Sequence, residues 1–384
     1  MKHRNSVLYA VLQQLDWGQF NALVAAHQAD KHVRALPTKT QFITLAFAQL
    51  SGISGLRETV TALNSHHNRL YHLGARPVKR STLSDANTLR PSAVFEEMFA
   101  FMVSKVHRGL RRAMDGTTYL IDSTSVKLNQ LSAEWARFSA RVCGAKVHVI
   151  YDPDTDQPIY AAFTTANVND ITAAHEMPIQ RGATYVFDLG YYDYRWWAKL
   201  HAAECRIVTR LKSNTRLTVT RERLMPPGGP ILSDRIGTLP ARQANSRKNP
   251  MNVEMREVRV RTDSGKVLRI LTNDLVAPAQ QIADLYKRRW LIELFFRWIK
   301  QTLRIKRFIG TSENAVRIQI AVALIAFILL RLAYGAQKGV PKLLEFVRLV
   351  RANLMQRRDI QALGQPDTPV QADPRQLCLD WQLV

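Results

Sequence analysis

The stretch from Tyr286 to Lys300, YKRRWLIELFFRWIK, constrains the chain more than any other. If it forms one helix, four of its polar residues share a strip about 60° wide: Tyr286, Arg289, Glu293 and Lys300. The other faces are almost entirely apolar, which is typical of a buried helix, and a buried polar strip needs partners. The stretch therefore predicts a site that holds a cation and phosphates together. A basic amphipathic helix with an internal ion pair is the plainer alternative.

Two aspartates upstream each close a segment with the pattern of a buried strand. TTYLID ends in Asp122 and TYVFD ends in Asp188, and short β-rich apolar runs of this kind are typical of strands. Between them lie a hairpin over residues 146–165 and a helix capped by Asn169 or Asp170, and a further helix and strand follow. We therefore expect a mixed α/β domain with both aspartates at strand ends. Hard cations such as Mg²⁺ prefer carboxylate oxygens, and no His/Cys set has zinc spacing.

The spacing Tyr-(2)-Arg-(3)-Glu-(6)-Lys resembles the signature of a large group of bacterial insertion-sequence transposases of the DDE type. The segments DST at 122–124 and DLGYY at 188–192 are similar to the first and second aspartate motifs of that group. The resemblance covers roughly residues 117–335. It implies a ribonuclease-H-like catalytic fold, in which the first and fourth strands are neighbours and Asp122 lies next to Asp188.

The resemblance also implies roles for individual residues. Asp122, Asp188 and Glu293 would be the catalytic residues and the metal ligands, binding two Mg²⁺ ions for which Mn²⁺ could substitute. Tyr191 and Lys212 would contact DNA phosphates. The same role falls to three residues of the helical strip, in which a guanidinium fork suits phosphate well: Tyr286, Arg289 and Lys300.

The periodicity divides the chain into an α/β multidomain protein with an all-α start. Residues 1–112 form a predicted helical DNA-binding domain. Within it, residues 54–91 suggest a helix-turn-helix whose second helix, capped by Ser81, presents Arg80 and Asn87 to base edges. An ordinary helical hairpin is the alternative. The other predicted parts are a split catalytic domain, a β-rich insertion, and a helical tail with a disordered end: residues 113–211 with 276–340, residues 212–275, and residues 341–384.

Charge and composition indicate the partner. Lys and Arg number 54 against 31 Asp and Glu, which gives a formal charge of +23. This excess predicts a polyanionic partner, nucleic acid first and an anionic membrane second. The apolar run at 320–330 is too short to span a bilayer. Three scattered cysteines, Cys143, Cys205 and Cys378, suit a reducing cytosol. We therefore expect a bacterial cytoplasmic protein, associated with the nucleoid and not with a membrane.

The resemblance implies a transposase that binds the ends of its element as double-stranded DNA, cleaves phosphodiester bonds and joins the 3′-OH ends to target DNA, and the positive charge suits such a partner. A homodimer assembled on DNA is expected. An inactive derivative that binds DNA as a repressor, and a structure-specific nuclease on the same fold, are the alternatives. Residues 198–285 contain no Phe, Tyr or Trp. The insertion is therefore predicted to clamp the DNA backbone, with any flipped base stacked on a residue outside it.

Overall fold

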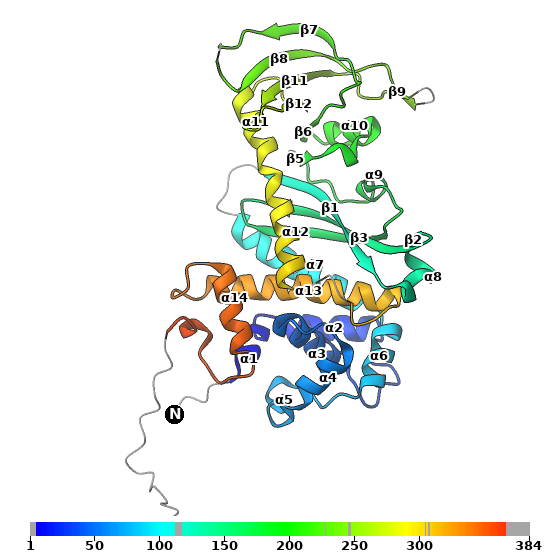
Figure 1. Ribbon diagram of the computed structural model, residues 1–384, viewed down its shortest axis with the longest axis vertical. Coiled ribbons are helices and arrows are strands. Elements are labelled where there is room, and N and C mark those ends of the chain that lie inside the picture. Colours follow the sequence, from blue (N-terminus) through cyan, green and yellow to red (C-terminus); the bar gives the residue numbers. More distant parts are fainter. Residues whose placement is uncertain are drawn as a thin grey trace, which may run out of the picture. The chain divides into compact units, whose positions relative to one another are not determined.

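The structure is a computed structural model of mixed α/β type (Figure 1). The chain forms two compact units. The smaller one consists of Met1–Gln14 and Leu329–Val384, and the larger one is Leu15–Ile328. This division separates the first helix from the rest of the predicted domain 1–112. The described residues are the following: 5–111, 117–226, 228–244, 247–303, 305 and 308–365. The predicted disorder at the end of the tail and residue Cys378 lie outside them.

A ten-stranded sheet forms the centre of the larger unit. Its strand order is β2-β3-β1-β5-β6-β12-β11-β8-β7, and β4 pairs with β3 off this path. In the first half β1 is antiparallel to β3, and β5 is parallel to both β1 and β6. The strands of this half are: β1 (Thr118–Leu128), β2 (Arg137–Ser139), β3 (Val142–Asp152), β4 (Gln157–Thr165), β5 (Thr184–Phe187) and β6 (Arg206–Arg210).

The predicted insertion 212–275 is β-rich, but its main strands continue the central sheet. Strand β12 pairs antiparallel with β6, with Thr272 opposite Val208. The β11–β12 hairpin turns at the predicted Asp263-Ser264-Gly265, where Gly265 has a φ of 78° that suits glycine. The pairing covers an edge of β6 that would otherwise expose unpaired backbone groups. The strands of this half are: β7 (Thr218–Arg223), β8 (Ile231–Thr238), β9 (Arg242–Ala244), β10 (Arg247–Lys248), β11 (Glu254–Arg261) and β12 (Val267–Thr272).

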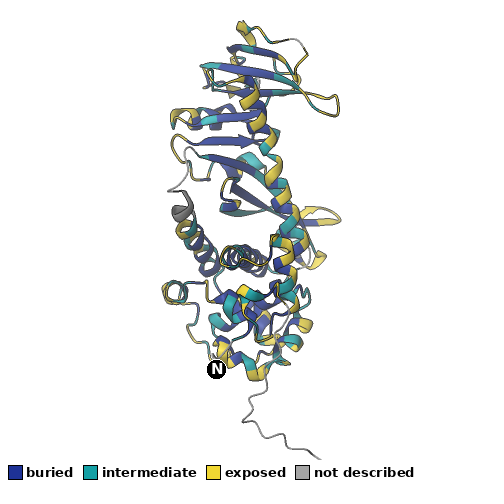
Figure 2. Cartoon of the chain, turned by 90° about the vertical axis from the view of Figure 1, so that its left-hand side faces the viewer, coloured by how far each residue is buried: buried dark blue, intermediate teal, exposed yellow. Residues whose placement is uncertain are grey.

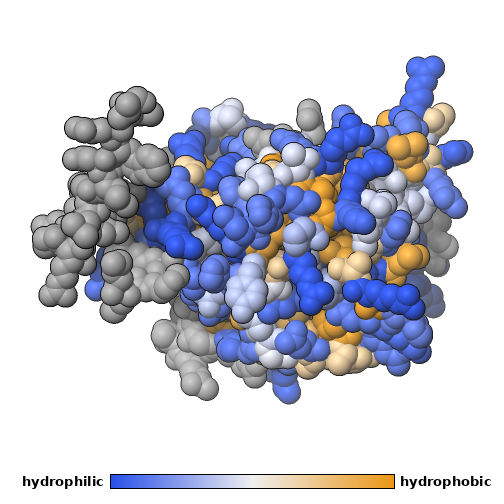
Figure 3. Space-filling model, turned by 90° about the horizontal axis from the view of Figure 1, so that it is seen from below, coloured by the Kyte–Doolittle hydropathy of each residue, from blue (hydrophilic) through white to orange (hydrophobic). Residues whose placement is uncertain are grey.

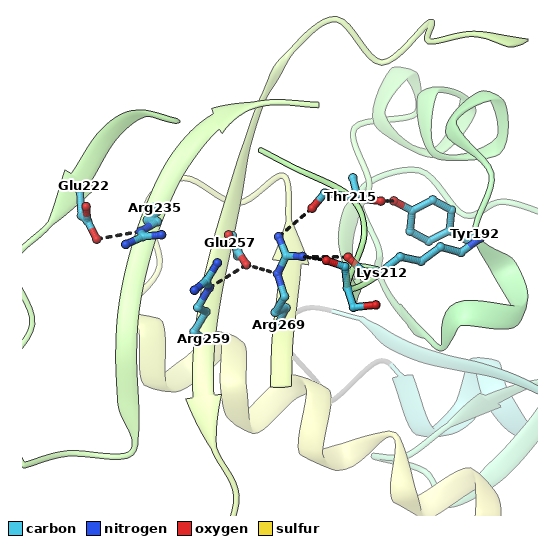
Figure 4. Close-up of polar contacts among 9 residues, drawn as sticks. Tyr192, Lys212, Thr215, Glu222, Arg235, Glu257, Arg259 and Arg269 are labelled. Carbon is cyan, nitrogen blue, oxygen red and sulfur yellow. Dashed lines mark hydrogen bonds and ion pairs between the residues drawn. The ribbon is translucent and has the colours of Figure 1, made fainter. Parts of the chain in front are cut away.

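Polar contacts fix the start of the insertion to its last strand (Figure 4). The Arg269 guanidinium donates to the carbonyl oxygens of Lys212 and Thr215 at 2.8 and 2.9 Å, and its Nε donates to Glu257. Thr215 also contacts a residue before the insertion, because its hydroxyl lies 2.9 Å from that of Tyr192. Chain entry into the insertion is therefore held by side chains as well as by strand pairing.

Aromatic side chains form the core beside β5. Phe187 on β5 contacts the rings of Tyr191 and Trp196, with centroids 6.1 and 4.8 Å away. Trp196 and Trp197 belong to α10 (Tyr194–Ala202), whose N-cap Asp193 accepts from two backbone N–H groups. Figure 2 shows the buried strands and helices in dark blue. A rigid aromatic core thus lies under the strand that precedes Asp188.

The N-terminal helices of the larger unit differ from the predicted helix-turn-helix in two respects. A further helix, α5, lies between the two predicted segments, so α4 and α6 are not joined by a tight turn. Helix α6 begins at Arg80 with Lys79 as its N-cap, so Ser81 is not the cap. These helices are: α2 (Trp17–Ala26), α3 (Thr38–Ser51), α4 (Leu56–Asn64), α5 (His67–Leu73), α6 (Arg80–Leu89) and α7 (Ala93–Arg111).

The smaller unit pairs the first helix with the C-terminal segment. The Val7 and Leu8 N–H groups at the start of α1 donate to the carbonyl oxygens of Gln356 and Leu354, at 3.0 and 2.8 Å. These two groups have no partner within the helix itself. The unit contains α1 (Val7–Leu12), α14 (Leu343–Ala352) and the 3-10 turn η3 (Ile360–Ala362).

The remaining helices include the apolar run. Helix α13 contains residues 320–330 and is the one helix, among those described, long and apolar enough to suit a membrane span. Most of its apolar window, 83%, is buried within the protein, which agrees with the prediction of a buried helix. The helices and turns are: η1 (Gln130–Ser132), α8 (Ala133–Ala136), α9 (Asp170–Ala174), η2 (Leu189–Tyr191), α11 (Ala279–Arg288), α12 (Trp290–Thr302) and α13 (Glu313–Gly335).

Candidate active site

Strand register brings the two predicted aspartates together. Ile121 on β1 lies opposite Phe187 on β5 in parallel pairing, so Asp122 and Asp188 follow at adjacent positions. Neighbouring strands are about 4.8 Å apart. The Asp122 Oδ1 accepts from the backbone N–H of Ser123 at 2.8 Å, which helps to orient the carboxylate. The predicted neighbourhood of the two aspartates is thus confirmed.

Asp122 does not end its strand, contrary to the prediction. Strand β1 continues to Leu128 because it pairs with β3 over the whole segment from Leu120 to Leu128. Strand β5 stops at Phe187, and Asp188 caps the turn η2 by accepting from the Gly190 N–H at 2.8 Å. Asp122 therefore lies within β1, at the level where its parallel neighbour ends.

Helix α12 brings the third carboxylate to the same place. The Arg289 Nη1 lies 3.3 Å from Asp122 Oδ2, and its Nη2 donates to Glu293 Oε1. One guanidinium therefore links a carboxylate of β1 to one of α12. All three side chains are mostly buried, which strengthens the attraction between their charges.

The sequence predicted one uninterrupted helix for the polar strip, but the structure divides it into two helices. Helix α11 ends at Arg288 and α12 begins at Trp290. Arg289 between them keeps helical angles, but its N–H and that of Ile292 each donate to a carbonyl three residues back. This tightening resembles a 3-10 turn. The expected full burial is also wrong, since the Trp290 side chain is 49% exposed.

The pKa of Asp122 is raised to about 6, chiefly by burial and also by the charges of Asp188 and Glu293, while the Ser123 N–H and Arg289 oppose the rise. The pKa of Tyr286 is also raised, chiefly by burial. The part of the rise in the pKa of Asp122 that comes from Asp188 and Glu293 reflects repulsion between neighbouring carboxylates. Cations are attracted to such a place.

The donor chemistry fits a hard divalent ion. Carboxylate oxygens are the ligands that Mg²⁺ favours, and water completes its shell. Among the described residues no three His, Cys, Asp or Glu side chains converge closely enough to hold one ion by themselves. Asp122 has Asp188 on one side and, through Arg289, Glu293 on the other. This arrangement suits ions shared between pairs of carboxylates and water.

The predicted DNA contacts fall into two groups. Arg80 and Lys212 are exposed, and the Lys212 ammonium lies 4.3 Å from the centroid of the Tyr192 ring (Figure 4). Lys300 is partly exposed, with its Nζ donating to the Ser125 carbonyl at 2.8 Å. These three side chains remain within reach of a ligand.

Three predicted contacts are buried. Tyr191 is 0% exposed and packs in the aromatic core, so it does not offer its hydroxyl to a phosphate. Asn87 is 4% exposed because its side-chain oxygen accepts from Gln41 at 2.9 Å, which turns it away from any base edge. Tyr286 is 8% exposed. The roles predicted for Tyr191 and Asn87 do not fit these positions.

Two residues near the site were not found from the sequence. Asp170, read only as a helix cap, accepts from Ser123 Oγ at 2.8 Å. Trp290, read as part of a buried face, lines a groove with Arg261 and Lys287. Asp170 gave no local signal because its partners come from β1 and β3. Trp290 could have been noticed as the ring adjoining Arg289.

Two family models match parts of this chain. Residues 114–329 match a family described as "Transposase DDE domain", and residues 3–76 match "Domain of unknown function (DUF4372)". The chain is 40% identical over 314 residues to "Putative transposase y4zB" of Sinorhizobium fredii (strain NBRC 101917 / NGR234), covering 81% of this chain and 85% of that protein.

A second relative is "Probable transposase for insertion sequence element IS5377" of Geobacillus stearothermophilus, 30% identical over 276 residues, which cover 71% of this chain and 72% of that protein. Among solved structures, a piggyBac transposase synaptic complex with hairpin DNA aligns with a TM-score of 0.44 and 12% identity, covering 91% of this chain and 78% of that one. Since the domain match spans more than half of the chain, the protein belongs to the family of transposases with a DDE domain and is an enzyme of that type.

Proposed function

We propose that the protein binds the ends of an insertion element, cleaves phosphodiester bonds there with two divalent metal ions, and joins the freed 3′-OH ends to target DNA. One observation carries the proposal. The β1–β5 register sets Asp122 beside Asp188, and Arg289 ties Glu293 of α12 to the same point. Two carboxylates of neighbouring strands and one of α12, all distant in sequence, are thus linked at one place.

Asp122, Asp188 and Glu293 are the residues that would hold the metal. Bound divalent ions supply charge relief to the phosphate and activation of the attacking oxygen. The chain contributes orientation, because backbone N–H groups fix one oxygen of each aspartate and leave the second oxygen of Asp188 for other ligands. Arg289 has five N–H donors, so after pairing with two carboxylates it can still donate to a phosphate oxygen.

The strand order supports a ribonuclease-H-like core. Without the short β2, the path β4-β3-β1-β5-β6 has three antiparallel strands followed by two parallel ones. Counted in chain order, the first strand of this set is β1 and the fourth is β5. These two strands are neighbours, as that fold requires. The Tyr-(2)-Arg-(3)-Glu-(6)-Lys spacing would then place its arginine and glutamate directly against the first strand.

The insertion is proposed to clamp the DNA backbone. Its surface carries more basic than acidic side chains, which favours phosphate contacts without sequence preference. A flipped base would stack outside it, and Trp290 offers an exposed ring beside Arg289. The exposed basic residues of the insertion are: Lys212, Arg216, Arg221, Arg242, Arg247, Lys248, Arg261 and Lys266.

Helix α5, rather than α6, is the better candidate for reading the element's ends. No acidic residue occurs between Glu58 and Asp85, and Tyr71 on α5 is 84% exposed. Arg76 follows α5 and is exposed as well. Figure 3 shows one face of the molecule, on which hydrophilic side chains surround hydrophobic patches. Basic side chains with an exposed ring suit a DNA surface.

A joining assay tests the proposal. Purified protein is mixed with labelled end DNA, unlabelled target and Mg²⁺, and joined product is measured on a gel. Asp122→Asn, Asp188→Asn and Glu293→Gln should each abolish cleavage and joining while end binding persists. Glu204→Gln, which removes a charge from a surface pair with Arg181, is the matched control and should stay active.

Other outcomes identify the alternatives. Cleavage without joining would indicate a structure-specific nuclease, and end binding without cleavage in the unaltered protein would indicate a repressor-like derivative. Near-normal activity in any carboxylate variant would exclude that residue from the site. Sizing the complex on end DNA tests the proposed homodimer, and cell fractionation tests the proposed cytoplasmic, nucleoid-associated location.

A further inference from the structure

A fourth carboxylate, that of Asp170, lies next to the Asp122–Asp188 pair. Asp170 is the first residue of α9, and its Oδ1 accepts from Ser123 Oγ at 2.8 Å. The Ser123 N–H in turn donates to Asp122 Oδ1 at 2.8 Å. Ser123 therefore links the two carboxylates, because its hydroxyl donates to Asp170 and its backbone N–H donates to Asp122.

The second oxygen of Asp170 faces Asp188 across a glycine. A methyl group on Gly190 would lie 3.0 Å from Asp170 Oδ2 and 3.0 Å from Asp188 Oδ1. Both oxygens lie 3.0 Å from the same Cβ position, so Asp170 Oδ2 and Asp188 Oδ1 are at most twice that distance apart. The missing side chain at Gly190 is what allows the two carboxylates to approach.

Side chains of β3 hold Asp170 in place. Lys146 Nζ donates to Asp170 Oδ1 at 3.1 Å and to the Val168 carbonyl at 2.9 Å. His148 is fully buried, and its Nδ1 lies 3.8 Å from Asp170 Oδ1 without a hydrogen bond among the described residues. Burial lowers the pKa of His148 to about 4, so its ring is neutral near pH 7. Lys146 is thus the positive partner of Asp170.

The buried hydroxyl of Tyr191 reports the same clustering. Burial raises the pKa of Tyr191 well above its ordinary value, and the next largest causes are the charges of Asp170, Asp122 and Asp188. The charges of these three carboxylates therefore all act on one hydroxyl. None of the roles proposed above uses Asp170.

We propose that Asp170 is a positioning residue of the carboxylate site. Through Ser123 it fixes the Asp122 carboxylate, and its Oδ2 accepts from water bound to an ion that Asp122 and Asp188 hold. The inference rests on the proposed function. Mg²⁺ and Mn²⁺ sites keep waters whose hydrogen bonds to outer carboxylates matter, and loss of such partners typically costs about 10–100-fold in metal affinity.

The test measures Mn²⁺ binding to the full chain by electron paramagnetic resonance. The signal of free Mn²⁺ decreases as the ion binds to the protein. Asp170→Asn keeps the size of the side chain and should raise the half-saturating Mn²⁺ concentration by about 10-fold or more. Gly190→Ala, which inserts a methyl group between the two carboxylates, should do the same. Combining the two changes should add little, because both disturb one arrangement.

Rates at high Mn²⁺ distinguish positioning from damage to the fold. A positioning role predicts that saturating Mn²⁺ restores most of the DNA cleavage rate in Asp170→Asn, and that Asp170→Glu is affected less. Glu204→Gln should leave the half-saturating concentration unchanged. If Asp170→Asn and Gly190→Ala both match Glu204→Gln, or if saturating Mn²⁺ restores nothing, the inference is overturned. If Asp122→Asn does not alter Mn²⁺ binding either, the proposed function fails as well.

Discussion

Asp122→Asn should stabilise the metal-free protein near neutral pH, although it should abolish catalysis. Burial, with smaller contributions from the charges of Asp188 and Glu293, raises the pKa of Asp122 from 3.8 to about 6. The folded protein therefore keeps a proton on this group where the unfolded chain has lost it. Stability falls as pH rises from about 4 to about 6, and above that range the full penalty applies.

The magnitude follows from the change in pKa. A rise of about 2 in pKa corresponds to about 3 kcal/mol, at about 1.36 kcal/mol for each unit of pKa. Asparagine cannot ionise, so the variant avoids a penalty of up to about this size near pH 7, and gains almost nothing near pH 4. The amide oxygen of the new side chain can still accept from the Ser123 N–H, as Asp122 Oδ1 does, which keeps the local geometry comparable.

Urea unfolding in EDTA, followed by tryptophan fluorescence to which the buried Trp196 and Trp197 contribute, measures the difference. The variant should unfold at higher urea near pH 7, and the gap should close as the pH approaches 4. Asp16→Asn is the control of opposite sign. The Gln19 N–H and Lys105 lower the pKa of Asp16, so its removal should destabilise near pH 7. A variant no more stable than the original near pH 7, or a gap that ignores pH, would refute the reasoning.

Three further outcomes are expected. Arg256→Met removes the close, buried ion-pair partner of Asp234 and leaves only Arg223 at 3.8 Å, so it should cost about 3–5 kcal/mol in urea unfolding, most of which Arg256→Met combined with Asp234→Leu should recover. Trp290→Ala should weaken base unstacking, read by 2-aminopurine near the element's end, by about 1–3 kcal/mol, and unchanged fluorescence would exclude the ring as the platform. Tyr71→Ala should weaken end binding in a gel-shift assay without lowering stability, whereas Asn87→Ala should lower stability because it leaves Gln41 short of an acceptor.

Much of the site could be predicted because its parts have local signatures. Apolar runs before Asp122 and Asp188 indicated two strands, and the parallel pairing of those strands brings their aspartates together. The spacing of Arg289 and Glu293, four residues apart on helical backbone, allows their side chains to pair. These interactions depend on short segments, so periodicity is enough to anticipate them.

The features that could not be predicted from the sequence depend on contacts with residues that are distant along the chain. Asn87 is polar and looked available, but Gln41 of another helix binds its side chain in the interior. Tyr191 follows an aspartate motif, yet the rings of Phe187 and Trp196 enclose it. Asp170 acquires its neighbours from strands that lie far away in sequence. No local pattern encodes such contacts.

The predicted insertion is β-rich, and the pairing of β12 with β6 changes what it can do. A body on a flexible linker could meet DNA at any angle. Here β12 pairs with β6, and β6 pairs in parallel with β5, which ends just before Asp188. Helix α11 packs against both halves of the sheet and leads directly into Arg289. The basic surface of the insertion and the carboxylates of the core are therefore joined by continuous backbone hydrogen bonding. Phosphates held by the insertion would lie at a set distance from Asp188, so a backbone clamp without sequence preference can still determine which bond reaches the carboxylates.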